Sequence, residues 1–62
     1  MNEKERQLLI DLLQAHLVNL QGHRDAIEHI PELAVVAEEG YRLIDEQAAL
    51  TRRTLTLIEE SL

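Results

Sequence analysis

Three histidines are the side chains with the clearest potential for chemistry. His16 and His23 are seven residues apart and so share one helical face, while His29 lies four residues after Asp25. A metal site needs three or four convergent ligands, and helical sites commonly use Glu-x-x-His or His-Glu-x-x-His spacing. Neither pattern occurs in the chain, so we expect no bound metal and no cofactor.

Residues for nucleophilic catalysis are scarce. The chain has no cysteine, its one serine is Ser61, and its two glycines are too far apart to form a phosphate-binding loop. A pair of helices also rarely encloses the concave pocket that an enzyme needs. We therefore expect a non-enzymatic protein without catalytic residues.

A row of apolar or small residues at alternating four and three spacing runs along the chain, with the only proline, Pro31, at its midpoint. This period is typical of amphipathic helices, and a central proline indicates a hinge between two of them. The spacing therefore predicts an all-α antiparallel helical hairpin that forms a single domain over residues 1–62. The members of this first row are Leu9, Leu13, His16, Leu20, His23, Ile27, Ile30, Ala34, Ala37, Tyr41, Ile44, Ala48, Thr51, Leu55, Ile58 and Leu62.

The first helix is predicted over about residues 3–29. Asn2 with Glu5 three residues later resembles a capping box, which marks the N-terminal end. Two C-terminal ends are consistent with the sequence: a stop at Gly22, or continuation to His29 at a cost of about 1 kcal/mol for an interior glycine. The apolar row continues across Gly22 without a change of spacing, and a helix end at His29 makes the two helices about equal in length. Both points favour an end at His29.

The second helix is predicted over about residues 31–60, with Pro31 at its first position. It carries a second apolar row beside the first, and two adjoining rows indicate two neighbours. We expect one neighbour to be the first helix and the other to belong to a second chain, so that two hairpins form a four-helix bundle. The expected packing residues of this helix are Leu33, Val36, Leu43, Leu50, Leu57, Ile44, Leu55 and Ile58.

Folding at the midpoint places residue i near residue 61 − i, which predicts specific neighbours. Gly22 falls opposite Gly40, which indicates either a close helix approach or two merely tolerated glycines. His16 falls opposite Asp45. His23 falls near Glu38 or Glu39. These polar pairs set the register, or else both histidines lie at the edge of the apolar row with one nitrogen in water.

The net charge of −6 is concentrated in residues 25–46, at the hinge end. Such an end suits a basic protein partner or is simply a solvated surface. The acidic residues of the expected partner surface are Glu28, Glu32, Glu38, Glu39, Asp45 and Glu46. Four basic residues, available for nucleic acid at the open end, are Lys4, Arg6, Arg52 and Arg53.

These patterns predict a small protein-binding module, such as a regulator, inhibitor or chaperone-like adaptor, that acts as a homodimer. One alternative is an RNA- or DNA-binding hairpin dimer, which the diluted basic charge does not favour. Another is an acidic mimic of nucleic acid that inhibits a basic partner. No apolar stretch is long enough for a membrane span, so we expect a cytoplasmic protein.

Overall fold

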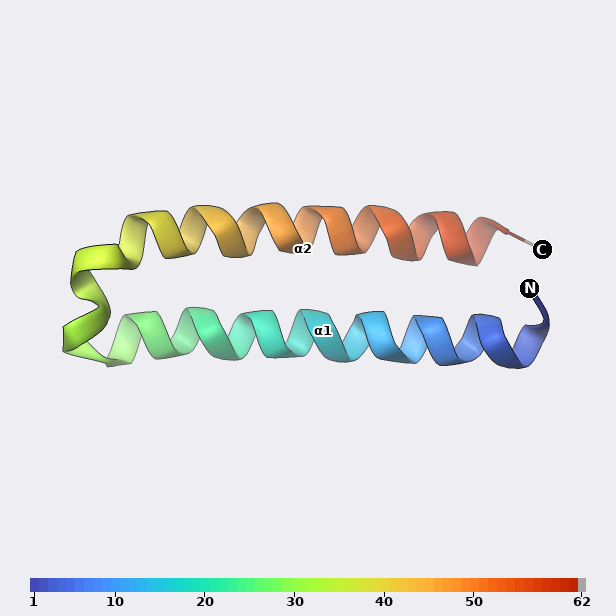
Figure 1. The fold of residues 1–62 in the computed structure, drawn as a ribbon, viewed down its shortest axis with the longest axis horizontal. Coiled ribbons are helices and arrows are strands. Elements are labelled where there is room, and N and C mark those ends of the chain that lie inside the picture. The colour runs from blue at the N-terminus through green and yellow to red at the C-terminus, as the bar shows by residue number, and fades with distance from the viewer. Residues whose placement is uncertain (62) are drawn as a thin grey trace.

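Two long helices run antiparallel and are joined by a short connection in the computed structural model, which describes residues 1–61 (Figure 1). α1 spans Glu3–His29, a 3-10 segment η1 spans Pro31–Val36, and α2 spans Ala37–Glu60. The Cα trace measures 45 × 15 × 10 Å, and both chain ends lie at the end opposite the connection (Figure 1). Within residues 1–61, neither helix has the combination of length and hydropathy that crossing a bilayer requires. Leu62, the last position of the predicted row, lies outside the described residues.

α1 begins at the predicted cap and continues through Gly22. The Asn2 side-chain oxygen accepts a hydrogen bond from the Glu5 amide at 2.8 Å, and the Asn2 amide nitrogen donates to the Glu5 carboxylate at 2.7 Å. The helix ends only at His29, so the longer of the two alternatives is confirmed. Side chains on one stripe continue to pack against α2 beyond Gly22, and this packing offsets the low helix propensity of glycine.

Removal of the cap tests its contribution to stability. We expect Asn2→Ala to lower the free energy of unfolding by about 1 kcal/mol, because the Glu5 amide loses its side-chain acceptor. Thermal unfolding followed by circular dichroism measures this change. Asn19→Ala, an exposed change in the middle of α1, is the control and should not destabilise the chain.

The prediction of an α-helix from Pro31 is wrong over its first six residues. Residues Pro31–Val36 form a 3-10 segment, and α2 begins only at Ala37. Ile30 is extended, with φ −107° and ψ 105°, and its carbonyl accepts from the Leu33 amide at 3.0 Å. The chain must cross from one helix to the other here, and the tighter 3-10 winding accommodates that crossing in a short segment (Figure 1).

The cross-hairpin register differs from the midpoint rule by about one helical turn. The guanidinium of Arg6 donates to the carbonyls of Ile58 and Glu59, at 3.3 and 3.2 Å. Arg24 places its guanidinium carbon 4.7 Å from the centre of the Tyr41 ring. Each residue of α1 therefore lies level with a residue of α2 about four positions later in the sequence than expected. The reason is that η1 forms the connection, whereas the prediction used its residues as the first turns of the second helix.

The core between the helices is thin. Among the described residues, the buried side chains are Ile10 and Leu20 of α1 with Thr51 and Leu55 of α2. Thr51 satisfies its buried hydroxyl by donating to the Gln47 carbonyl at 2.7 Å. The accessible surface is 4843 Å², whereas a compact monomer of 7.1 kDa has about 4,100 Å². The hairpin thus leaves more surface in water than a compact folded chain of its mass.

Candidate functional site

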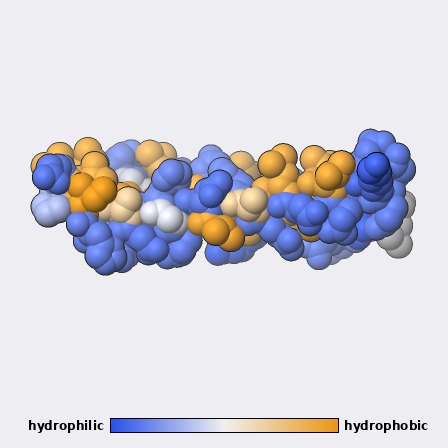
Figure 2. All heavy atoms as spheres, turned by 90° about the horizontal axis from the view of Figure 1, so that it is seen from below, coloured by the Kyte–Doolittle hydropathy of each residue, from blue (hydrophilic) through white to orange (hydrophobic). Residues whose placement is uncertain are grey.

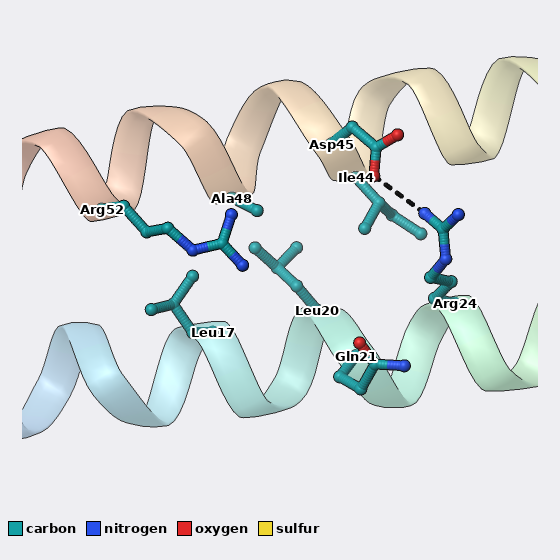
Figure 3. A pocket seen from close by; sticks show the side chains of 8 residues that line it. All are labelled: Leu17, Leu20, Gln21, Arg24, Ile44, Asp45, Ala48 and Arg52. Carbon is teal, nitrogen blue, oxygen red and sulfur yellow. Dashed lines mark hydrogen bonds and ion pairs between the residues drawn. The ribbon is translucent and has the colours of Figure 1, made fainter.

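The two broad sides of the hairpin differ in chemistry, and one side is polar. A shallow hollow between the helices marks this polar side (Figure 3). Arg24 crosses the gap from α1 and donates to the Asp45 carboxylate of α2 at 2.8 Å, as the dashed line shows. Polar groups from both helices therefore lie on this side. The residues that line the hollow are Leu17, Leu20, Gln21, Arg24, Ile44, Asp45, Ala48 and Arg52.

The opposite side carries exposed apolar side chains from both helices, and we call it the apolar face. On α2, Leu43, Leu50 and Leu57 recur every seven residues and are 48%, 52% and 63% exposed. The stripe of α2 that faces α1, which we call its inward row, contains the half-buried or buried residues from Tyr41 to Ile58. By the helical period, the three leucines lie on one side of this inward row, and Asp45 and Arg52 lie on the other. Figure 2 shows hydrophobic residues gathered mainly along one edge of the molecule and hydrophilic residues along the other.

α1 supplies its own row to the apolar face. Leu9 and Leu12 are exposed and lie across the inward row of α1 from Gln21, which lines the hollow on the polar side. His16 and His23 continue the Leu9 row at seven-residue intervals and are also exposed. The apolar face consists of Leu9, Leu12, His16, His23, Leu43, Leu50 and Leu57.

The other predicted packing residues lie elsewhere. Ile44 and Ile58 are half-buried and Leu55 is buried, all on the stripe of α2 that faces α1. Leu33, half-buried, and Val36, exposed, belong to η1 at the hinge. On α2 the first row is therefore used inside the hairpin and the second row stays open, whereas on α1 the first-row residues Leu9, His16 and His23 are exposed.

The predicted histidine pairs are not formed. Asp45 lies on the polar side and binds Arg24, whereas His16 lies on the apolar face. Within residues 1–61, neither His16 nor His23 makes a side-chain hydrogen bond or an ion pair, and Glu38 makes none either. His16 and Asp45 lie on opposite sides of the hairpin, so the register is not set by this pair.

The two glycines do not lie opposite each other. A Cβ atom at Gly22 would meet nothing within 4 Å, whereas one at Gly40 would lie 2.7 Å from Cδ1 of Ile27. Only Gly40 thus marks a close approach, and its neighbour is a side chain of α1 rather than Gly22. The absence of a Cβ at Gly40 lets Ile27 pack directly against the backbone of α2.

This difference predicts opposite mutational behaviour. Gly22→Ala should raise the free energy of unfolding by up to about 1 kcal/mol, because it adds helix propensity in open space. Gly40→Ala should gain less or destabilise the hairpin, because the Ile27 methyl group must move. Chemical denaturation of the two variants at equal concentration measures the difference, and a larger gain at Gly40 would contradict this packing.

Arginines neutralise much of the predicted acidic surface. Arg42 binds Glu39 and Glu46, and these two carboxylates, Glu39 first, raise the pKa of Arg42 above its ordinary value. Arg24 binds Asp45 and lies 4.0 Å from a Glu28 oxygen. In the described part of the chain, Glu32 and Glu38 make no ion pair. The hinge end is therefore less strongly acidic toward a partner than its composition indicates.

The four basic candidates do not gather into one patch. Arg6 is committed to Glu3, at 2.9 Å, and to the last carbonyls of α2. Arg52 lines the polar hollow, while Lys4 and Arg53 are exposed. A phosphate backbone would therefore meet scattered charges rather than a basic stripe.

Residues 1–61 contain no group of three side chains of the kind that could hold a metal ion. No family model, curated protein or solved structure matches the chain. The apolar face thus stands as the candidate functional site on its geometry alone.

The cluster of Arg24, Tyr41 and Asp45 was not predicted from the sequence. Arg24 follows Leu20 by four residues and precedes Ile27 by three, so the helical period indicates that Arg24 faces α2. Its partners could not be predicted, because they depend on the length of the connection. The half-buried guanidinium packs on the Tyr41 ring and reaches Asp45, so it links the helices beside their core.

Proposed function

We propose that the chain is a non-enzymatic protein-binding module that associates with a second copy of itself through the apolar face, giving a four-helix bundle. The observation that carries this proposal is the row Leu43, Leu50 and Leu57, whose side chains are 48–63% exposed beside a second exposed row on α1. Exposed leucines that recur on one side of a helix are typical of a surface that packs against a partner. A second copy of the chain carries the same row of leucines over the same length, so its apolar face would cover the whole row.

The size of the face is adequate for a stable dimer. The Cα trace measures 45 Å by 15 Å in the plane of the two helices, so one whole broad side of the hairpin has a projected area of about 700 Å² per subunit. Two subunits would bury about 1,400 Å², which lies within the usual range for specific interfaces. A chain this short also benefits from a partner, because a thin core alone gives little stability.

The module would present its hinge end to another protein. Glu32 and Glu38 lie at this end outside the arginine pairs, and Asp25 is exposed near them. These carboxylates would suit a basic partner, through contacts that weaken as salt is raised. The dimer itself should persist in high salt, because apolar contacts form it.

Sedimentation equilibrium at neutral pH tests the dimer. We expect a mass of twice 7.1 kDa at micromolar protein, unchanged when salt is raised. Thermal unfolding should shift to higher temperature with increasing concentration, as it does for a two-chain assembly. A monomer that stays monomeric and stable at all soluble concentrations would refute the proposal.

A further inference from the structure

Charge is distributed unevenly along the long axis of the hairpin. Residues 25–46 at the hinge end carry seven carboxylates and one arginine, whereas the acids and bases of the open-end segments balance. The two ends are separated along an axis of 45 Å. That distance is several times the screening length of about 8 Å at physiological salt, so charges at opposite ends barely interact.

Two copies can stack their apolar faces in two ways, with both hinges at one end or at opposite ends. The first arrangement places two acidic hinges side by side, and the second places each hinge over the balanced open end of its partner. We propose that the second copy is inverted, so that His16 of both copies meets at the twofold axis and acid weakens the association. This inference rests on the dimer proposed above.

The register of the hairpin fixes which residues reach that axis. Arg6 meets Ile58 and Glu59, Arg24 meets Tyr41, and a Cβ at Gly40 would touch Ile27. These pairs place residue 50 of α2 at the level of residue 16 of α1. Residue 16 is also the middle of Glu3–His29. An inverted partner therefore brings His16 to His16 and Leu50 to Leu50.

The other residues of the two seven-residue rows then match in pairs. Leu43 of one copy lies opposite Leu57 of the other, because both are seven residues from Leu50. Leu9 lies opposite His23 in the same way. The seven-residue spacing of both rows is thus symmetric about the proposed axis, and no leucine of either row is left without an apolar or aromatic-ring neighbour.

The surroundings of His16 determine the effect of acid. On α1 its neighbours along the helix are Leu12 and Leu20, and the nearest titratable group of the same row is His23, two turns away. On α2 the charged residues of this level beside the face are Glu46, which lies four residues before Leu50 and is paired with Arg42, and Arg53, which lies three residues after Leu50. The inverted partner adds a second His16 and a second Arg53. Glu46 is held by Arg42, and the neighbours of His16 along α1 are apolar, so protonation opposes association.

Cysteine pairing tests the orientation, since the chain has no cysteine of its own. Leu50→Cys should form a disulfide-linked dimer under mild oxidation. Leu43→Cys and Leu57→Cys alone should not, because identical residues would lie about 20 Å apart at 1.5 Å per residue. A mixture of Leu43→Cys and Leu57→Cys should cross-link again. These three single variants are matched controls on one row.

A different pattern would overturn the inverted arrangement. With both hinges at one end, α1 packs over α2 of the partner, and a mixture of His16→Cys and Leu50→Cys cross-links while Leu50→Cys alone does not. A dimer in sedimentation that shows this second pattern refutes the orientation and leaves the proposed function intact. A monomer in sedimentation refutes the proposed function itself.

The dimer dissociation constant at about pH 7.5 and about pH 5.5 tests the role of His16. A histidine held between apolar side chains opposes association once it is protonated, so the dissociation constant should be higher at the lower pH, and both copies of His16 contribute to this rise. His16→Leu should remove this part of the rise and tighten the dimer at both pH values. His29→Gln, away from the face, should keep the full rise. A full rise in His16→Leu would refute the proposed contact.

Discussion

Leu50→Glu is expected to dissociate the proposed dimer, raising its dissociation constant by about 1,000-fold or more. Leu50 is 52% exposed at the middle of the apolar face, and the twofold axis would bring both copies of the residue together. Two carboxylates would then lose water without a cationic partner, at a cost of several kcal/mol. Sedimentation velocity over a concentration series measures the change.

A matched variant separates this effect from general loss of structure. Val18→Glu places the same charge on α1 at a residue that is 71% exposed and lies off the apolar face. It should keep the dimer and its helical circular dichroism. If Leu50→Glu remains a dimer of unchanged affinity, the apolar face is not the interface.

Leu55→Ala is expected to lower the free energy of unfolding by about 2–5 kcal/mol, the range for removal of a buried leucine side chain. Leu55 is 7% exposed and is one of the four buried residues among residues 1–61. For a domain this small, such a loss is a large part of the total free energy of unfolding. The variant should therefore be partly unfolded at room temperature. Urea denaturation at one fixed protein concentration measures the change.

An exposed leucine supplies the control for this core substitution. Leu8→Ala removes the same atoms from a residue that is 60% exposed, and it should change stability by no more than about 0.5 kcal/mol. Equal losses at the two positions would mean that α1 and α2 do not pack through Leu55. The comparison therefore tests the hairpin itself, independently of the dimer.

Local signals allowed the limits of α1 to be predicted. The Asn2 cap depends on residues three apart, and its geometry follows from the sequence alone. The apolar period likewise predicted which residues of α2 face α1, from Tyr41 to Leu55, and which form a second row. Periodicity is a property of one helix, so it needs no knowledge of the partner helix.

The neighbours across the hairpin could not be predicted in the same way. A midpoint fold assumes that no residues are used in the connection, yet Pro31–Val36 form it. This difference of about one turn removed the match between Gly22 and Gly40, and the long side chain of Arg24 reaches Asp45 on the polar side. Whether a proline starts an α-helix or a 3-10 turn depends on where the next helix must pack, which is a tertiary property.

Arg6 joins the beginning of the chain to its end. Its guanidinium donates to the carbonyls of Ile58 and Glu59, where the dipole of α2 is negative. Helix ends usually fray independently, but here opening of the first turn of α1 breaks the hydrogen bonds of Arg6 to the last turn of α2. Amide protons at the two termini should consequently exchange with solvent as a single unit, and a tag or fusion that displaces one terminus would loosen the other.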